Sequence, residues 1–347
     1  MMNFDANSNR NGAVFLRFIA IILVINSHMD ILYPVQWLAT GGAIGNSLFF
    51  MLSSYGLLLS EKSNHQSFSG YFIKRINRIY PAVWVNILLF VLPLAAFYYF
   101  TSPFWYAEIV SEFALNQPLS LLGVIFYPPT AHWFLQALML FYLFGFFFIS
   151  NYSFKKLSVG FLFLSLLYIF FYLQFSDYSS WVTESTLLFK IIFYAMIFLS
   201  GIYFAAINER IIYRGIVDWL ALLLMLIVIY VHKFMMLNGF SGELQFIEQL
   251  AIFPLLYYCL KVSKSTFVIE TLMKQPVIAG FISVIAAMTL ELYMVHGATR
   301  ILIHQFIATF PVNVILYLLI TFMISYGLYR FTQYMMFRIF NQMMIKP

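Results

Sequence analysis

The chain has 347 residues and a formal net charge of +6 at pH 7; 63% of its residues are hydrophobic and only 9% are charged. Soluble domains are about 25% charged, and a soluble core of this size has no room for so much apolar surface. The composition therefore excludes an ordinary soluble protein and indicates an integral membrane protein. The single cysteine, Cys259, excludes a disulfide within the chain.

Ten apolar segments are long enough to cross a bilayer as helices, which takes about 20 residues each. They lie roughly at 12–32, 40–60, 79–101, 133–150, 157–175, 186–207, 216–236, 244–262, 276–297 and 311–335. The segment 101–132 is ambiguous, because LSLLGVIF also fits a re-entrant or interfacial piece. No segment alternates as a strand would. The sequence predicts an all-α, polytopic membrane protein with one transmembrane domain over residues 1–347 and no separate soluble domain.

The basic residues favour one orientation of these spans. If both termini are cytoplasmic, the cytoplasmic segments carry fifteen of the nineteen Lys and Arg residues and the outer segments carry two, Lys233 and Arg300. This bias is the positive-inside pattern of a multi-pass protein of the cytoplasmic (inner) membrane. It explains the net charge without a nucleic-acid partner. No small-residue cleavage site follows the first span, so we expect that span to stay in the mature protein.

The first span reads RFIAIILVINSH and carries an ionisable residue at each end, Arg17 and His28. His28 follows Arg17 by eleven residues, which is three helical turns to within about 20°. The two side chains therefore share one face of the helix and lie about 16 Å apart along its axis. One explanation is purely structural: long polar side chains near the ends of a span extend to the lipid headgroups. Their alignment inside the membrane favours a functional role instead, because intramembrane charges are costly.

Four later segments of the chain form a pattern together with the Arg17–His28 spacing. In chain order they are SLFFMLSSYGLLLS (47–60), YFIKRINRIYPAVW (71–84), HWFL (132–135) and LELYMVHGATR (290–300). Together with the Arg17–His28 spacing, they resemble the acyltransferase-3 family of membrane acyltransferases. Arg75 and Arg78 match the basic R-x-x-R element of that family, and Tyr293 and His296 match its late motif. Ser54 stands where glycine is common, and Glu291 replaces the more usual serine.

The resemblance implies transfer of an acyl group, usually acetyl, from cytoplasmic acyl-CoA to a hydroxyl of an extracytoplasmic or lipid-linked glycan. Acetyl-CoA would be a donor substrate and not a bound cofactor. Arg75 and Arg78 would bind its phosphates, although topological anchoring also explains them. His28, Arg17 and Glu291 are the candidate catalytic residues, with Glu291 as a group that orients the base. The candidate acceptor-binding residues are His132, Trp133, Tyr293 and His296.

Two questions stay open at this level. His28 fits a general base that deprotonates the sugar hydroxyl, and it also fits a nucleophile that carries the acyl group. A transporter or flippase of an anionic or lipid-linked substrate would also use buried charges, but the paired broken helices typical of transporters are not evident. No metal-ligand spacing occurs, and Lys190 and Glu248 receive no role.

Overall fold

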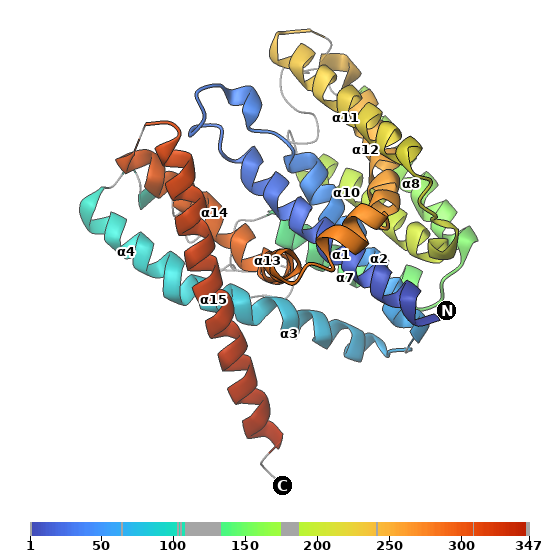
Figure 1. The fold of residues 1–347 in the computed structure, drawn as a ribbon, viewed down its shortest axis with the longest axis horizontal. Coiled ribbons are helices and arrows are strands. Elements are labelled where there is room, and N and C mark those ends of the chain that lie inside the picture. Colours follow the sequence, from blue (N-terminus) through green and yellow to red (C-terminus); the bar gives the residue numbers. More distant parts are fainter. Residues whose placement is uncertain are drawn as a thin grey trace. The chain divides into compact units, whose positions relative to one another are not determined.

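The computed structural model describes residues 2–63, 65–102, 104, 106–107, 133–174, 187–240, 242–307 and 309–344, and these residues contain helices and no strands (Figure 1). The α-helices are α1 Met2–Ser27, α2 Gly42–Ser63, α3 Phe68–Asn86, α4 Leu92–Thr101, α7 Trp133–Ile149, α8 Phe154–Leu173, α10 Leu187–Ala206, α11 Ile216–Leu237, α12 Gln245–Val262, α13 Pro276–Ala287, α14 Thr289–Phe306 and α15 Val312–Met344. Two π-helical stretches, η2 Ile87–Val91 and η5 Phe267–Leu272, interrupt the pattern.

All ten segments expected to span the membrane fall on these helices, and the protein is a polytopic membrane protein. Seven of the described helices are long and apolar enough to cross a bilayer, or eight if α13 and α14 form one broken span. Two differences from the expected ranges stand out. The third span starts earlier, since α3, η2 and α4 run together over 68–101. The ninth is interrupted at Met288, where one non-helical residue separates α13 from α14.

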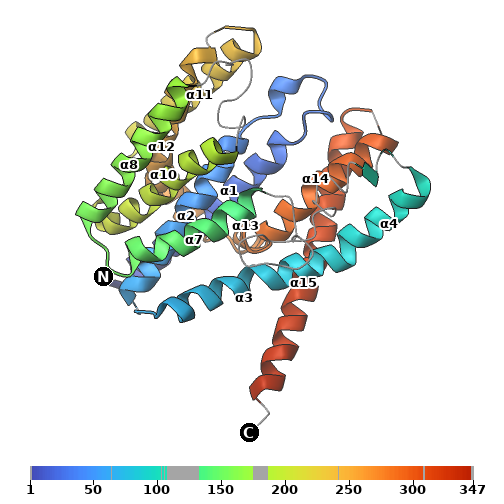
Figure 2. The same cartoon turned by 180° about the vertical axis from the view of Figure 1, so that it is seen from behind.

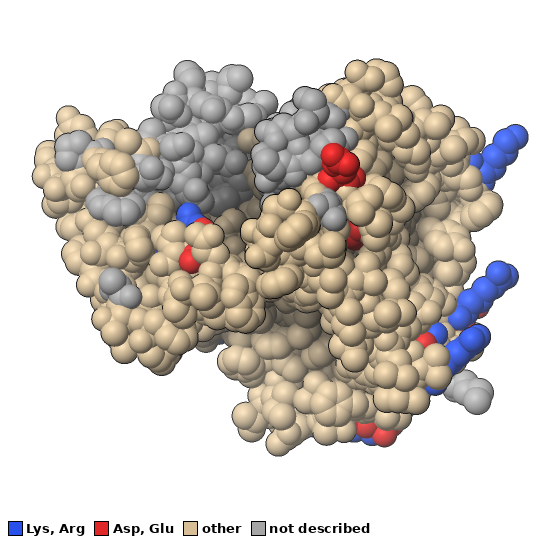
Figure 3. Space-filling model, turned by 90° about the horizontal axis from the view of Figure 1, so that it is seen from above, with Lys and Arg blue, Asp and Glu red and all other residues tan. Residues whose placement is uncertain are grey.

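The helix surfaces explain the composition. Only 17% of the α8 span and 11% of the α11 span are buried inside the protein, and their exposed side chains are mostly Leu, Ile, Val and Phe. Among the residues that Figure 3 draws in colour, most are uncharged. In water such a surface would be very unfavourable, whereas hydrocarbon accepts it, because lipid tails are as apolar as leucine.

The chain divides into two compact units. Unit 1 comprises residues 1–20, 43–66 and 143–286, and unit 2 comprises residues 21–42, 67–142 and 287–347. Helices α8 and α10–α13 therefore belong to unit 1, and α3, α4, α14 and α15 belong to unit 2. Each unit is assembled from segments that lie far apart in the sequence.

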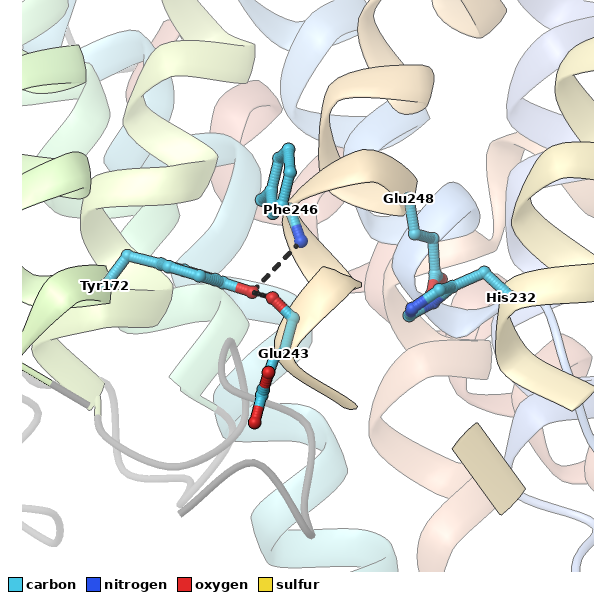
Figure 4. Close-up of polar contacts among 5 residues, drawn as sticks. All are labelled: Tyr172, His232, Glu243, Phe246 and Glu248. Atoms are coloured by element: carbon cyan, nitrogen blue, oxygen red, sulfur yellow. Dashed lines mark hydrogen bonds and ion pairs between the residues drawn. The ribbon is translucent and has the colours of Figure 1, made fainter. Parts of the chain in front are cut away.

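In unit 1, two buried polar pairs join the antiparallel helices α11 and α12. Asp218 and Lys261 form an ion pair at one end, and His232 Nδ1 lies 3.2 Å from Glu248 Oε2 at the other (Figure 4). Asp218 and His232 are fourteen residues apart on α11, and their partners Lys261 and Glu248 are thirteen residues apart on α12. Both pairs therefore fix the same register of the two helices. Glu248, which had no role in the sequence, therefore has a structural one. A charge left without its partner at this depth would cost several kcal/mol.

A second contact near the same end of unit 1 holds α8 against the start of α12. The Tyr172 hydroxyl donates to the Glu243 carbonyl (2.6 Å) and accepts from the Phe246 backbone N–H (3.2 Å) (Figure 4). The first N–H groups of a helix have no partner within the helix. Tyr172 satisfies one of them and so places the end of α8 beside the start of α12.

In unit 2, the run α3–η2–α4 packs along α14 and is crossed by α15 (Figures 1 and 2). The Tyr98 hydroxyl donates to Gln305 Oε1 (2.8 Å). Val91 lies seven residues before Tyr98, Ala298 lies seven residues before Gln305, and both belong to one buried cluster. The two helices therefore run parallel. On the other side of α14, Thr299 bonds to Thr321 of α15 (2.7 Å).

The buried pair between α11 and α12 predicts a large effect on stability. Lys261→Met should lower the free energy of unfolding by about 3–5 kcal/mol, because it leaves Asp218 buried and unpaired. Adding Asp218→Asn to that variant should recover most of the loss. Thermal unfolding in detergent measures both. The control is Lys274→Met, since Lys274 forms an exposed pair with Glu270 at 3.7 Å that is worth at most about 1 kcal/mol. Equal losses in Lys261→Met and Lys274→Met would contradict the assignment.

Candidate active site

Two histidines from distant parts of the chain meet in unit 2. Helix α1 ends at Ser27, and the His28 backbone N–H still bonds to the Ile25 carbonyl (3.2 Å). The His28 ring lies 4.7 Å from the His296 ring of α14, centroid to centroid, with the planes at 60°. His296 is buried, whereas His28 is exposed. The structure thus brings together two of the predicted site residues, which we call the histidine pair.

The backbone of α14 selects one tautomer of His296. Its Nδ1 lies 3.3 Å from the carbonyl oxygen of Leu292, one turn earlier. A carbonyl oxygen only accepts, so Nδ1 carries the proton when this bond forms. In the neutral ring the basic lone pair is then on Nε2. His296 therefore presents one defined basic nitrogen.

An unbroken series of ring contacts links Trp133 to the histidine pair. Trp133 and Phe134 on α7 lie 6.2 Å apart, Phe134 lies 4.8 Å from Tyr293, and Tyr293 lies 5.4 Å from His296. Phe134, Tyr293 and His296 are buried, and Trp133 is partly exposed. Trp133, Tyr293 and His296, which the sequence assigned to acceptor binding, thus form one aromatic cluster. His132 lies outside the described residues.

An ion pair that the sequence did not reveal holds the histidine pair together. Arg300 Nη1 lies 3.1 Å from Asp30 Oδ1, with the side chains 23% and 43% exposed. Asp30 follows His28 by two residues, and Arg300 follows His296 by four, which is one helical turn. The pair therefore ties the segment after α1 to α14 beside the two rings. A signal was present, because Arg300 is a basic residue on the side where the sequence otherwise places acidic ones.

The segment that follows His28 has further fixed contacts. Asn26 donates to the carbonyls of Leu38 (2.9 Å) and Thr40 (2.9 Å), and it accepts from the Tyr33 hydroxyl (2.7 Å). Asn313 of α15 donates to the Leu32 carbonyl (2.8 Å). Side-chain amides thus replace the helical bonds that end with α1. His28 follows a rigid helix and precedes an anchored loop.

Glu291 is buried in the first turn of α14, where the partial positive charge of the helix N-terminus favours a carboxylate. Five residues separate it from His296, so their side chains leave the helix about 140° apart. Seven residues separate it from Ala298, which packs against Val91, and seven residues are nearly two full turns. Glu291 is therefore on the α3 side of α14.

The two arginines of α3 have different surroundings. Arg75 is partly buried, with its guanidinium 4.5 Å from the centre of the Tyr71 ring and Nη1 donating to the Tyr71 carbonyl (3.1 Å). Arg78 is exposed. Pro81 lies inside α3, and a proline cannot donate to the carbonyl four residues earlier. The helix continues nevertheless, so both arginines stay in line with η2 and α4.

Arg17 belongs to unit 1, whereas His28 belongs to unit 2. Helix α1 contains Arg17 and ends at Ser27, directly before His28, and Arg17 is partly buried. The proposed action of Arg17 and His28 along one face therefore remains a prediction from the sequence.

The fold is that of a multi-pass membrane protein, and its histidine pair joins an exposed to a buried imidazole. Comparison with known proteins defines the class as a membrane acyltransferase. The chain belongs to the acyltransferase-3 family, whose model, described as an acyltransferase domain, matches residues 13–330. That range contains every described site residue, and the resemblance found in the five sequence segments is confirmed.

One characterised relative is similar over a short stretch. The peptidoglycan O-acetyltransferase OatA of Listeria monocytogenes is 38% identical over 82 residues, which are 22% of this chain and 12% of that protein. The matched region is thus a small part of the relative's length. No solved structure matches the chain.

The Asp30–Arg300 pair can be tested with a double-mutant cycle. Asp30→Asn and Arg300→Gln should each lower acyl transfer by up to about fivefold, since a partly exposed pair is worth at most about 1 kcal/mol. The double variant should lose no more than either single variant, because both changes remove the same contact. Acyl transfer in isolated membranes is the measurement, and Glu270→Gln is the control. Losses that multiply in the double variant would show that the two residues act separately.

Proposed function

We propose that the protein transfers an acyl group, most simply acetyl, from cytoplasmic acyl-CoA to a hydroxyl of an extracytoplasmic or lipid-linked glycan. Membership of an acyltransferase family supports the reaction class, and the relative's name, peptidoglycan O-acetyltransferase, supports acetyl as the group and a glycan as the acceptor. The whole chain would act as one domain, with ten spans and both termini cytoplasmic in the inner membrane. The distribution of basic residues supports that orientation.

The observation that carries this proposal is the histidine pair, 4.7 Å between ring centres. His28 is exposed, so an acceptor hydroxyl can approach it, while His296 is buried behind it. A neutral imidazole takes up a proton near neutral pH, which is the task of a general base in hydroxyl acylation. His28 would be that base, and His296 would position it.

The reaction needs only the two substrates. The acceptor oxygen attacks the thioester carbonyl carbon, a C–O bond forms and the C–S bond breaks. The proton of the hydroxyl passes to His28 and ends on the sulfur of free CoA. Atoms and electrons therefore balance without an oxidant, a reductant or a metal.

The remaining predicted residues divide between the two substrates. Arg75 and Arg78 would bind the phosphates of CoA. Trp133, Tyr293 and His132 would bind the acceptor, since aromatic rings stack on the apolar faces of sugars. Glu291 is on the α3 side of α14. It would therefore lie beside the path of the donor and would not orient the base.

Replacement of His28 tests the proposal directly. His28→Ala should abolish acyl transfer at saturating acyl-CoA, because no base remains to take the hydroxyl proton. Binding of acyl-CoA, measured by its thermal stabilisation of the purified protein, should be unchanged. His304→Ala, an exposed histidine on the same helix as His296, is the control and should keep activity. Near-normal transfer in His28→Ala would remove that residue from the mechanism.

The two arginines of α3 should contribute unequally to the binding of acyl-CoA. Arg75→Ala should weaken acyl-CoA binding at least tenfold and Arg78→Ala should weaken it less, because Arg75 is partly buried and Arg78 is exposed. The affinity for the acceptor should stay the same in both. The control is Lys74→Ala, since Lys74 is exposed on the same helix. Unaltered donor binding in Arg75→Ala would make the arginines topological anchors.

A further inference from the structure

Two neighbouring cavities lie between α8, α10 and α12 of unit 1. Their volumes are about 770 Å³ and 570 Å³. Both are lined by Phe161, Ser165 and Phe253, and the rings of Phe161 and Phe253 lie 5.8 Å apart. We call the two cavities together the α8 groove. Its lining residues are uncharged, and most of them are apolar.

The α8 groove follows one face of α8 along the whole helix. The lining residues of α8 begin at Phe154, end at Leu173 and recur at spacings of three and four residues, which is the spacing of one helix face. Nineteen residues separate the first from the last, which is about 28 Å of helix. The hydrocarbon core of a bilayer is about 30 Å thick. The groove therefore extends across nearly the whole apolar layer.

The α8 groove is open to the lipid along its side. Leu162 and Leu173 of α8 and Leu250 of α12 line it, and each is more than half exposed. The exposed face of a membrane-spanning helix meets lipid tails and not water. An opening on this face admits hydrocarbon chains.

Two polar side chains in the smaller cavity have no hydrogen-bond partner among the described residues. Gln249 of α12 is 4% exposed and Tyr168 of α8 is 9% exposed, and both line this cavity. Neither amide atom of Gln249 is paired, and the Tyr168 hydroxyl is not paired either. Buried polar groups are normally hydrogen-bonded, because their desolvation is otherwise uncompensated. These two therefore indicate an occupant with a polar atom.

Gln249 and Tyr168 lie at nearly the same depth on facing helices. The Tyr172 hydroxyl accepts from the Phe246 N–H (Figure 4), and α8 and α12 run antiparallel from this contact to the one between Phe161 and Phe253. Gln249 follows Phe246 by about 4.5 Å, and Tyr168 precedes Tyr172 by about 6 Å, in the same direction. The amide and the hydroxyl thus form one polar spot in an apolar groove.

The polar spot has the depth and the chemistry that suit a lipid ester. Gln249 lies about 6 Å from the start of α12 and Tyr168 about 8 Å from the end of α8, which is the depth of the boundary between headgroups and acyl chains. An ester carbonyl oxygen accepts two hydrogen bonds, and an amide N–H and a phenol O–H can donate them. A phosphate at this depth would lack a cation, because no lysine or arginine of the described chain lines the groove.

We propose that the α8 groove binds one acyl chain of a glycerophospholipid, with Gln249 and Tyr168 donating hydrogen bonds to the ester carbonyl at the head of that chain. From Tyr168 to Phe154 the groove extends about 21 Å, whereas one leaflet is about 15 Å of hydrocarbon, so an extended chain fits. Ser165 is the small side chain at the junction, where the chain passes from one cavity into the other. The lipid stabilises unit 1. This site goes beyond the proposed function and does not depend on acyl transfer.

A pair of matched lipids tests the recognition of the ester. The purified full-length protein is stripped of lipid in a detergent without ester groups, and its thermal unfolding is followed with added dioleoyl phosphatidylcholine or with the dialkyl ether analogue, which lacks only the carbonyl oxygens. The ester lipid should raise the Tm in a concentration-dependent manner. The ether lipid should bind about tenfold more weakly, because it accepts neither hydrogen bond. Equal stabilisation by the two lipids would overturn the proposal.

Replacement of the glutamine places the effect on the polar spot. Gln249→Leu keeps the size of the side chain and should fold, because it removes an amide that has no partner among the described residues. The preference for the ester over the ether lipid should shrink at least threefold in this variant. Gln275→Leu, at an exposed glutamine of the same unit, is the control and should keep the full preference. A full preference in Gln249→Leu would contradict the assignment.

A blocked groove tests the location of the acyl chain. Ser165→Trp fills the junction of the two cavities and should abolish stabilisation by either lipid. Val159→Trp is the control, because Val159 is 60% exposed on the same helix and does not line the groove. Stabilisation that survives Ser165→Trp would place the lipid elsewhere. If polyprenyl phosphate stabilises the protein more than the ester lipid does, and Ser165→Trp removes that effect, the occupant is an isoprenoid and the phospholipid assignment is wrong.

Discussion

The hydrocarbon surroundings of the helices govern the rest of this structure, because a polar group inside a membrane must find its partner within the protein. Two buried pairs meet this constraint. In unit 1, Asp218 pairs with Lys261 and Glu248 with His232, and these contacts fix the register of α11 against α12. In both units, other buried polar side chains have no hydrogen-bond partner among the described residues, for example Gln249 in unit 1 and Asn86 in unit 2. The paired groups of unit 1 hold its scaffold together.

The histidine pair illustrates how contacts with other helices position a residue at the end of a helix. His28 stands where α1 ends, a place where a side chain would normally be mobile. The Asp30–Arg300 pair and the bond from Asn313 to the Leu32 carbonyl hold the following segment against α14 and α15. The His296 tautomer is set by the carbonyl of Leu292. Positioning of the histidine pair therefore depends on contacts from the segment after α1, from α14 and from α15.

Helix geometry is irregular in both units, with the π-helical stretch η5 in unit 1 and η2 in unit 2. In unit 2, Pro81 lies inside α3, η2 separates α3 from α4, and Met288 separates α13 from α14. Each irregularity weakens helical hydrogen bonding where lipid offers no replacement. Such features are frequent at functional sites, since a π turn re-aims the side chains on either side of it.

The amino-acid sequence by itself determined the class of this protein. Apolar segments of membrane-spanning length set the all-helical fold, and the spacing of Arg17, His28, Arg75, Arg78, Tyr293 and His296 indicated the family, because both signals are local along the chain. Only the tertiary structure decided which residues meet. The contacts of His28 with His296 and of Asp30 with Arg300 join positions about 270 residues apart, and helix periodicity carries no information on such pairs. The π-helical stretch Ile87–Val91 was also decided only by the tertiary structure, and it shifts the 3.6-residue period on which any reading of the sequence relies.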